Sequence, residues 1–249
     1  MKSISNVAAV IPAAGLGRRM GSGRNKVWLS LNGEPVIGHT LRAFMAVPAV
    51  ARIVLVVHAD EEEIFRTYLE NAWPDQAGTR IVLTTGGKER QDSVYRGLQS
   101  LEEWPEWSRA GRRLVAIHDA ARALLTPQLL EASLAAGWEY GAVGVAVPVK
   151  DTIKQVDAAG YVSATPERAA LRAIQTPQVF DFETILACYK RLSASGRYFS
   201  DDCGVAEACG ERVKLIEGSY ENLKITTPED LWLAEAILRR RADADRSGI

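Results

Sequence analysis

The fold is decided by a stretch near the start of the chain, Val7-Ala-Ala-Val-Ile11, which continues as Pro12-Ala-Ala-Gly15-Leu-Gly17-Arg-Arg-Met20-Gly-Ser-Gly23-Arg-Asn-Lys26. The first five residues form a continuous apolar run of the kind that predicts a strand covered on both faces. From Gly15 to Lys26 the chain then has four glycines, four cations and no acidic residue. Glycines allow the backbone to approach a ligand closely, and cations supply charge for phosphate oxygens. The stretch therefore predicts a first strand followed by a polyphosphate-binding loop.

The alternation of strands and helices continues along the chain and predicts the fold class. Further buried strands are expected at residues 53–57, 81–84, 114–117 and 143–147. Helices are expected between them, over residues 36–47 and from helix starts at Asp60, at Thr126-Pro127 and at Thr227-Pro228. This order predicts an α/β protein with a doubly wound, mostly parallel sheet in a single domain, residues 1–249.

One region breaks this alternation. Residues 150–178 contain two short polar strand patterns around the turn Asp157-Ala-Ala-Gly160, which predicts a β-arm inserted at about residues 150–172. A two-stranded arm cannot bury an apolar side alone. We therefore expect the arm to project from the sheet and to be covered by a partner chain.

The composition argues against several classes of protein. Of the 249 residues, 47% are apolar and 24% are charged, as in globular proteins. A net charge of −1 argues against a nucleic-acid binder, and three cysteines without a CxxC pair argue against a disulfide framework or zinc site. No apolar run reaches the length of a membrane span, and Pro12 interrupts the only run that resembles a signal peptide. We therefore expect a cytoplasmic protein that binds neither nucleic acid nor membrane.

The glycine-rich loop matches neither of two common nucleotide-binding motifs. The dinucleotide pattern GxGxxG fails where Met20 stands in place of its third glycine, and the acidic residue expected about 20 positions later is absent. The P-loop pattern fails because no Gly-Lys pair is followed by Ser or Thr. An NAD-dependent oxidoreductase and a non-catalytic nucleotide sensor are the alternatives from other classes of protein.

Three later motifs place polar side chains where an α/β sheet binds ligands. Gly86-Gly87-Lys-Glu-Arg90-Gln-Asp-Ser93 precedes a helix, and it fits either a ligand contact or an ordinary turn with a helix cap. Asp119 directly follows an apolar strand at the carboxyl edge of the sheet, where a carboxylate beside phosphates favours Mg²⁺. Asp119 fits a helix cap equally well, and Lys224, in a strand-like segment, fits a side chain that points to water.

Taken in order, the motifs resemble one enzyme family. Pro-Ala-Ala-Gly-Leu-Gly-Arg-Arg-Met is similar to the signature loop of sugar-phosphate nucleotidyltransferases. The later motifs resemble those of the 2-C-methyl-D-erythritol 4-phosphate cytidylyltransferases: Gly-Gly-Lys-Glu-Arg-Gln-Asp-Ser-Val (86–94), His-Asp-Ala-Ala-Arg (118–122), Pro-Val-Lys-Asp-Thr (148–152), Gln-Thr-Pro-Gln-Val-Phe (175–180) and Glu-Gly-x-x-x-Asn-Leu-Lys-Ile-Thr (217–226). The resemblance implies a Rossmann-like nucleotidyltransferase that transfers CMP from CTP to methylerythritol 4-phosphate for isoprenoid synthesis.

The resemblance also implies roles for particular residues. The catalytic cations would be Arg19, Lys26 and Lys224. The residues that hold CTP would be Ala13, Ala14, Gly15, Gly87, Arg90, Ser93 and Asp119. The acceptor phosphate would be held by Arg122, Thr152, Arg168 and Lys224. Asp119 would also contact Mg²⁺ or another divalent cation, with no organic cofactor, and the arm would reach into the other subunit of a homodimer.

The sequence departs from the family pattern at three positions. Asn25 stands where the family usually has Pro, Ala123 stands where Pro is frequent, and Glu167 replaces the usual Asp before Arg168. The charged groups remain, so these changes concern the rigidity of the loops more than the chemistry.

Two questions of specificity stay open at this stage. A ribitol 5-phosphate cytidylyltransferase is the nearest alternative, and its loop usually reads Ala-Gly-Gly where this chain has Ala-Ala-Gly15. We also hypothesise that backbone carbonyls near Gly86 and Gly87 recognise the N4 amino group that distinguishes cytosine from uracil.

Overall fold

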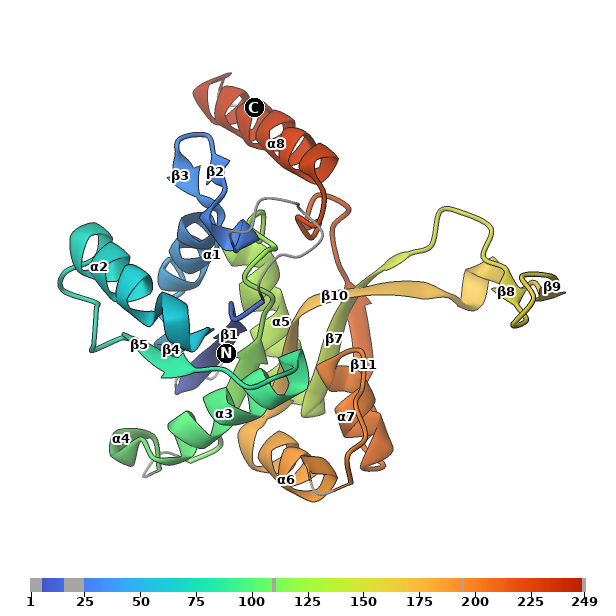
Figure 1. Ribbon diagram of the computed structural model, residues 1–249, viewed down its shortest axis with the longest axis horizontal. Coiled ribbons are helices and arrows are strands. Elements are labelled where there is room, and N and C mark those ends of the chain that lie inside the picture. The colour runs from blue at the N-terminus through green and yellow to red at the C-terminus, as the bar shows by residue number, and fades with distance from the viewer. Residues whose placement is uncertain (1–5, 16–24, 109–110, 194, 248–249) are drawn as a thin grey trace.

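A seven-stranded sheet forms the centre of the molecule, in the order β11-β7-β10-β6-β1-β4-β5 (Figure 1). The computed structural model describes residues 6–15, 25–108, 111–193 and 195–247. The strands are β1 (Val7–Pro12), β4 (Val50–Val57), β5 (Ile81–Thr85), β6 (Leu114–Ile117), β7 (Ala142–Pro148), β10 (Arg172–Asp181) and β11 (Lys214–Glu217). Neighbouring strands are parallel except around β10, which is antiparallel to both β6 and β7. The predicted mostly parallel α/β sheet is confirmed.

Helices cover both faces of this sheet. One face is covered by α1 (Val36–Met45), α2 (Glu62–Ala72) and α5 (Pro127–Tyr140), and the other by α3 (Arg90–Glu102), α4 (Pro105–Ser108), α6 (Phe182–Ser193) and α7 (Asp202–Ala208). In β1, Val7, Ala9 and Ile11 belong to the first core, whereas Ala8 and Val10 belong to the second. Because successive side chains point to opposite faces, a strand between two helix layers must be apolar throughout.

The C-terminal helix α8 (Pro228–Ser247) packs outside these layers (Figure 1). Its Ala234 and Ile237 join a third apolar cluster that includes Leu31 in β2 (Ser30–Leu31), which pairs with β3 (Glu34–Pro35). None of the helices in the described part of the chain is long and apolar enough to span a bilayer.

Two of the predicted helix starts are confirmed and one is wrong. Thr126 caps α5 by accepting a hydrogen bond from the Leu129 N–H at 3.2 Å, and Pro127 is the first helical residue. At the start of α8, Asp230 Oδ2 accepts hydrogen bonds from the Thr226 and Thr227 N–H groups. Asp60 is no helix cap, because the chain first forms a short helix, η3 (Ala59–Glu61), and α2 begins only after it.

An arm projects from the sheet between β7 and β10 (Figure 1). Its tip is a separate pair of strands, β8 (Gln155–Val156) and β9 (Val162–Ala164), followed by the short helix η4 (Arg168–Ala170). Gly160 adopts a φ of +86° in the turn, a conformation that favours glycine. Tyr161 is 74% exposed, and Val156 and Val162 are each 59% exposed. The single chain therefore leaves the apolar side chains of the arm uncovered.

Candidate active site

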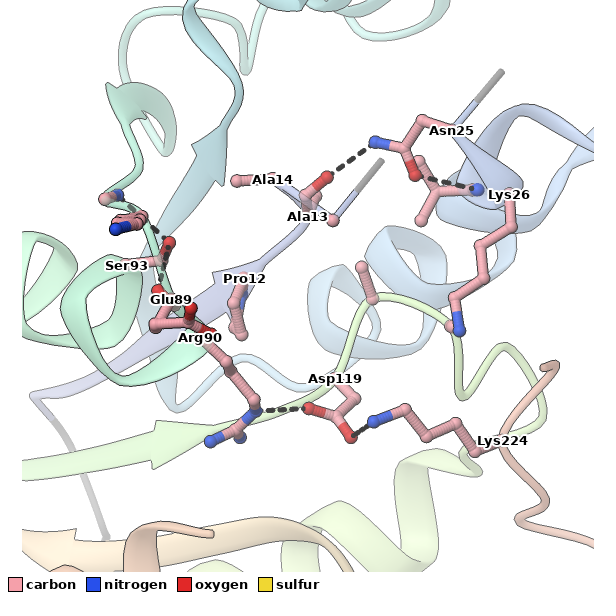
Figure 2. A pocket seen from close by; sticks show the side chains of 16 residues that line it. Pro12, Ala13, Ala14, Asn25, Lys26, Glu89, Arg90, Ser93, Asp119 and Lys224 are labelled. Carbon is pink, nitrogen blue, oxygen red and sulfur yellow. Dashed lines mark hydrogen bonds and ion pairs between the residues drawn. The ribbon is translucent and has the colours of Figure 1, made fainter. Parts of the chain in front are cut away.

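A pocket of about 380 Å³ lies at the carboxyl ends of β1 and β6, where open α/β sheets bind ligands. Figure 2 shows its polar side chains converging from several elements. All seven residues that were predicted to bind the nucleotide line this pocket: Ala13, Ala14, Gly15, Gly87, Arg90, Ser93 and Asp119. Two of the predicted catalytic residues, Lys26 and Lys224, line it as well. Arg19, predicted to be catalytic, lies outside the described residues.

One side of the pocket, which we call the loop wall, consists of residues 12–15 and 25–27 together with Gly87 and Ser93. Gly86 packs closely against two of these residues, Ala14 and Ser93. The hydrogen bonds of the loop wall are made mainly by the backbone. The Ala13 N–H donates to Val56 O at 2.7 Å, which continues the pairing of β1 with β4. Ser93 Oγ accepts from the Gly87 N–H and donates to Glu89 O, both at 3.1 Å. Ser93 thus fixes the turn before α3 from within the helix, and the N-cap is Glu89.

Gly86 and Gly87 differ in what they contact. A Cβ atom at Gly86 would lie 2.7 Å from Ala14 Cβ and 2.8 Å from Ser93 Oγ, so only glycine fits between these two residues. The Gly86 carbonyl accepts a hydrogen bond from Arg96 at 2.6 Å. Gly87 itself lines the pocket, so its carbonyl is the better candidate for reading cytosine.

The opposite side, which we call the charged wall, consists of Arg90, Asp119 and Lys224, together with Asp202, which pairs with Arg90 but is buried and does not line the pocket (Figure 2 shows all but Asp202). Arg90 Nε donates to Asp119 Oδ1 at 2.9 Å, and Lys224 Nζ lies 2.7 Å from Asp119 Oδ2. The two remaining Arg90 nitrogens donate to the two oxygens of Asp202 at 3.1 and 2.8 Å. Arg90 is therefore a bridge between two carboxylates.

The charges of this wall fix the protonation of its members. Burial alone would raise the pKa of the Asp119 carboxyl, but the charges of Arg90 and Lys224 outweigh it and hold that pKa well below its usual range. For Arg90, burial lowers the pKa, and the charges of Asp202 and Asp119 more than reverse this effect. Asp119 is thus a carboxylate and Arg90 a guanidinium at neutral pH.

Sequence analysis did not identify Asp202 as a residue of the site. It is fully buried, and its Oδ1 also accepts a hydrogen bond from the Tyr189 hydroxyl at 2.5 Å. The cap of α7 is its neighbour Asp201, whose Oδ1 accepts from the Gly204 N–H at 3.1 Å. The only signal in the sequence is that Asp202 is a second acidic residue next to Asp201, although one side chain is enough to cap a helix.

A smaller pocket of about 120 Å³ adjoins the charged wall and shares Arg90, Asp119 and Lys224 with the first. Arg122 also lines it and donates through Nη1 to Asn222 O at 2.7 Å, while its Nε is buried and has no hydrogen-bond partner among the described residues. A guanidinium that lines a pocket is suited to an anionic ligand. Lys224 lies in a loop rather than the predicted strand, and it is directed to Asp119 rather than to water.

His118 supports the backbone beneath the charged wall. It is fully buried, with Nδ1 3.0 Å from Thr176 Oγ1 and Nε2 3.2 Å from Arg122 O. The same Thr176 hydroxyl accepts a hydrogen bond from the Asp119 N–H at 3.1 Å. Burial lowers the pKa of His118 to about 4, so the ring is neutral at pH 7.

The structure does not bring two predicted residues to either pocket. Thr152 and Arg168 are exposed on the arm, and Arg168 Nη1 donates to Lys150 O at 3.0 Å.

The three residues that depart from the family pattern lie in different surroundings. Ala123 is buried in the apolar cluster beneath α8, Glu167 is exposed, and Asn25 is buried beside the pocket.

The chain is similar to known proteins over nearly its whole length. A sequence model of the family "2-C-methyl-D-erythritol 4-phosphate cytidylyltransferase" matches residues 7–240. The chain belongs to this family.

Relatives that bear this family name are similar along nearly their whole length. A 2-C-methyl-D-erythritol 4-phosphate cytidylyltransferase from Desulforamulus reducens is 44% identical over 238 residues, which cover 96% of this chain and 98% of the relative. One from Pelotomaculum thermopropionicum is also 44% identical, over 96% of each chain. The ribitol 5-phosphate alternative is therefore not favoured.

Solved structures of the cytidylyltransferase family have the same fold. The 4-diphosphocytidyl-2C-methyl-D-erythritol synthase of Anaerococcus prevotii superimposes with a TM-score of 0.80 at 32% identity, over 94% of this chain and 96% of that one. The cytidylyltransferase of Thermus thermophilus gives a TM-score of 0.72 at 31% identity, over 94% of this chain and 99% of that one.

Proposed function

We propose that this protein transfers CMP from CTP to 2-C-methyl-D-erythritol 4-phosphate, a step in the synthesis of isoprenoid precursors. An oxygen of the acceptor phosphate forms a bond to the α-phosphorus of CTP, the bond from that phosphorus to the bridging oxygen breaks, and pyrophosphate leaves. The observation that carries the proposal is that Lys26, Arg90 and Lys224 meet Asp119 at one pocket. The names of the family and of its relatives support the same reaction.

The pocket provides charge and position rather than a covalent nucleophile. The acceptor phosphate is itself an anionic nucleophile, so catalysis requires alignment and neutralisation of the charge on the transferred group. We assign this neutralisation to Lys26 and Arg19. Lys224 is held in place by Asp119 and is directed to the border of the two pockets, where the acceptor phosphate would approach.

The two substrates would occupy different parts of the site. We assign CTP to the larger pocket, against Ala13, Ala14, Gly15, Gly87, Arg90, Ser93 and Asp119. The acceptor phosphate would bind beside Lys224 and Arg122, two cations that both line the smaller pocket.

A divalent cation such as Mg²⁺ fits the donor set of the pocket. Asp119 is ionised, and each of its oxygens retains a lone pair beyond its contact with Arg90 or Lys224. Mg²⁺ is commonly held by one or two carboxylates together with substrate phosphates. Bound there, the ion would neutralise charge on the triphosphate.

The proposal includes a homodimer in the cytoplasm, where CTP is available. The exposed apolar side chains of the arm support a second copy as its cover. Thr152 and Arg168 lie on the same arm, away from both pockets of their own chain, so they would complete the acceptor site of the other subunit.

The first experiment is pyrophosphate release with CTP and Mg²⁺, comparing methylerythritol 4-phosphate with ribitol 5-phosphate. We expect release with the first acceptor, and a loss of about 10²–10³-fold in kcat for Lys26→Ala. Release with ribitol phosphate alone would reassign the acceptor. Absence of release with either acceptor would leave only nucleotide binding and would support the sensor alternative.

The second experiment tests whether the arm acts across the dimer. Lys26→Ala and Arg168→Ala each remove one half of the site, and we expect each variant alone to be nearly inactive. After subunits are exchanged, a mixed dimer keeps one intact pocket that faces one intact arm, so about a quarter of wild-type activity returns. If activity does not return although mixed dimers form, the arm does not complete the partner's site.

A further inference from the structure

Asn25 occupies an unusual position for a polar side chain, since it is only 3% exposed and directly precedes Lys26. Its Nδ2 donates to Ala13 O at 2.6 Å and to Glu61 Oε2 at 2.8 Å. Its Oδ1 accepts from the Val27 N–H at 3.4 Å. Both amide hydrogens and the amide oxygen therefore have partners, as a buried amide requires.

The three partners belong to three different parts of the site. Ala13 follows the last residue of β1, and Glu61 is the last residue of η3. Val27 lies in η2 (Lys26–Trp28), whose Trp28 ring packs against Phe65 of α2 at 4.4 Å between ring centroids. Figure 2 shows Asn25 directed to Ala13, while the adjacent Lys26 extends into the pocket. One side chain thus joins the end of β1 to the turn that carries Lys26.

The chemistry of this position requires an amide rather than a particular backbone shape. Asn25 has φ −62° and ψ 125°, which most residues adopt and which also suits proline. Alanine would leave the Ala13 carbonyl and the Glu61 carboxylate without this donor. Aspartate would place a second carboxylate against Glu61 and would offer no hydrogen to Ala13 O.

We propose that Asn25 is a positioning residue for nucleotidyl transfer, one that fixes Lys26 relative to the backbone of Ala13. This inference rests on the proposed function, in which Lys26 stabilises charge that develops during the reaction. A group that acts mainly on the transition state affects kcat more than KM when it is displaced. A displacement of about 1 Å can cost up to about 10²-fold in rate.

The test compares Asn25→Ala, Asn25→Asp and Asn25→Pro with a control, Asn71→Ala, at an exposed position on α2. We expect Asn25→Ala to lower kcat by about 10- to 100-fold and to change KM for CTP by less than about threefold. Asn25→Pro restores the fixed φ and is expected to recover part of this loss. The kcat of Asn25→Asp is expected to fall as far as that of Asn25→Ala. Adding Glu61→Gln to Asn25→Asp should restore part of the activity, because the glutamine amide can donate a hydrogen bond to the new carboxylate.

A double-mutant cycle with Lys26→Ala, measured in single turnovers, separates positioning from general loss of structure. If Asn25 acts through Lys26, Asn25→Ala has an effect of less than about twofold in the Lys26→Ala background. An equal fold-loss in both backgrounds, or an unchanged kcat for Asn25→Ala alone, would overturn the proposal.

Hydrogen exchange provides a readout that does not depend on turnover. Peptides covering residues 25–31 are expected to exchange faster in Asn25→Ala than in the wild type, because the turn of η2 loses its tie to β1. If the wild type shows no transfer at all, the proposed function fails while this comparison still decides whether Asn25 holds the turn. Unchanged exchange would show that it does not.

Discussion

The loop wall and the charged wall face the same pocket, but they are held by different interactions. The loop wall depends on backbone contacts and on short polar side chains such as Ser93 and Asn25. The charged wall depends on a chain of ion pairs, in which Arg90 contacts Asp202 across 112 positions of sequence. Substitutions in the charged wall should therefore affect both stability and activity, whereas most substitutions in the loop wall should affect activity alone.

The largest expected effect comes from breaking the charged wall at Asp202. Asp202→Ala leaves Arg90 with only Asp119 as a carboxylate partner and removes the acceptor of the Tyr189 hydroxyl. Removing one partner of a buried ion pair typically costs about 3–5 kcal/mol of unfolding free energy. Urea unfolding measures this loss, and KM for CTP should rise in the same variant because Arg90 is no longer held.

Asp60→Ala, at a side chain that is 89% exposed, is the control and should change stability by less than about 0.5 kcal/mol. A loss below about 1 kcal/mol for Asp202→Ala would show that the two walls do not differ in this way.

The second prediction concerns pH and the support beneath the charged wall. His118 has a pKa of about 4 in the folded protein, where burial is the main cause and Arg122 and Arg90 also lower it while Asp119 raises it. In the unfolded chain a histidine has a pKa of about 6.5, so the unfolded state binds more protons between pH 4 and 6.5. The unfolding free energy therefore falls as pH decreases through this window, by up to about 3 kcal/mol, and is constant above it as far as His118 is concerned.

Urea unfolding at several pH values between 4 and 7 measures this slope. His118→Gln should flatten it even if it lowers stability at pH 7, whereas His58→Gln, at the partly exposed His58, should leave it intact. A slope that persists unchanged in His118→Gln would assign the pH dependence to other groups.

The third prediction tests a place where the residues of the loop wall are packed as tightly as a core. Gly86→Ala forces a Cβ against Ala14 and Ser93, and overpacking of this kind costs about 1–3 kcal/mol. Because both neighbours border the pocket, we expect KM for CTP to rise by about tenfold, measured by steady-state kinetics. Gly15→Ala is the matched control for crowding, since no heavy atom of the described residues lies within 4 Å of the position that a Cβ would take there. Equal effects on stability at both positions would contradict the packing argument.

Sequence patterns were enough for the part of the site that follows local rules. Asp119 could be placed because it follows an apolar strand, and Gly15 because it follows another. The ion pair between Asp202 and Arg90 could not be predicted in this way, because no local pattern links residues so far apart in the sequence. Asn25 was noticed only as a missing proline, since its bonds to Ala13 and Glu61 depend on tertiary structure.

The two strands of the central sheet that sequence analysis missed, β10 and β11, were also hidden by what surrounds them. β10 contains Pro177, and proline inside a central strand normally argues against a strand. In the structure this proline falls at the register shift between Gln175 and Gln178, where the pairing with β7 is interrupted. β11 has only four residues, mostly exposed, and lacks the apolar run that identified the other strands.

The smallest expected effect is that of Ser93→Ala in the loop wall. It removes the acceptor of the Gly87 N–H, which should cost about 1 kcal/mol, or about a fivefold rise in KM for CTP. If the Gly87 backbone reads the N4 amino group of cytosine, the preference for CTP over UTP should fall by a similar factor, because Ser93 fixes that backbone. Ser133→Ala is the control, since Ser133 is a buried serine of α5 that donates to Leu129 O and lines neither pocket. Ser133→Ala should lower the unfolding free energy by about as much as Ser93→Ala and should leave the ratio of CTP to UTP activity unchanged. A preference unaltered in Ser93→Ala would remove the Gly87 turn from base recognition, and the loop wall would then act on the phosphates alone.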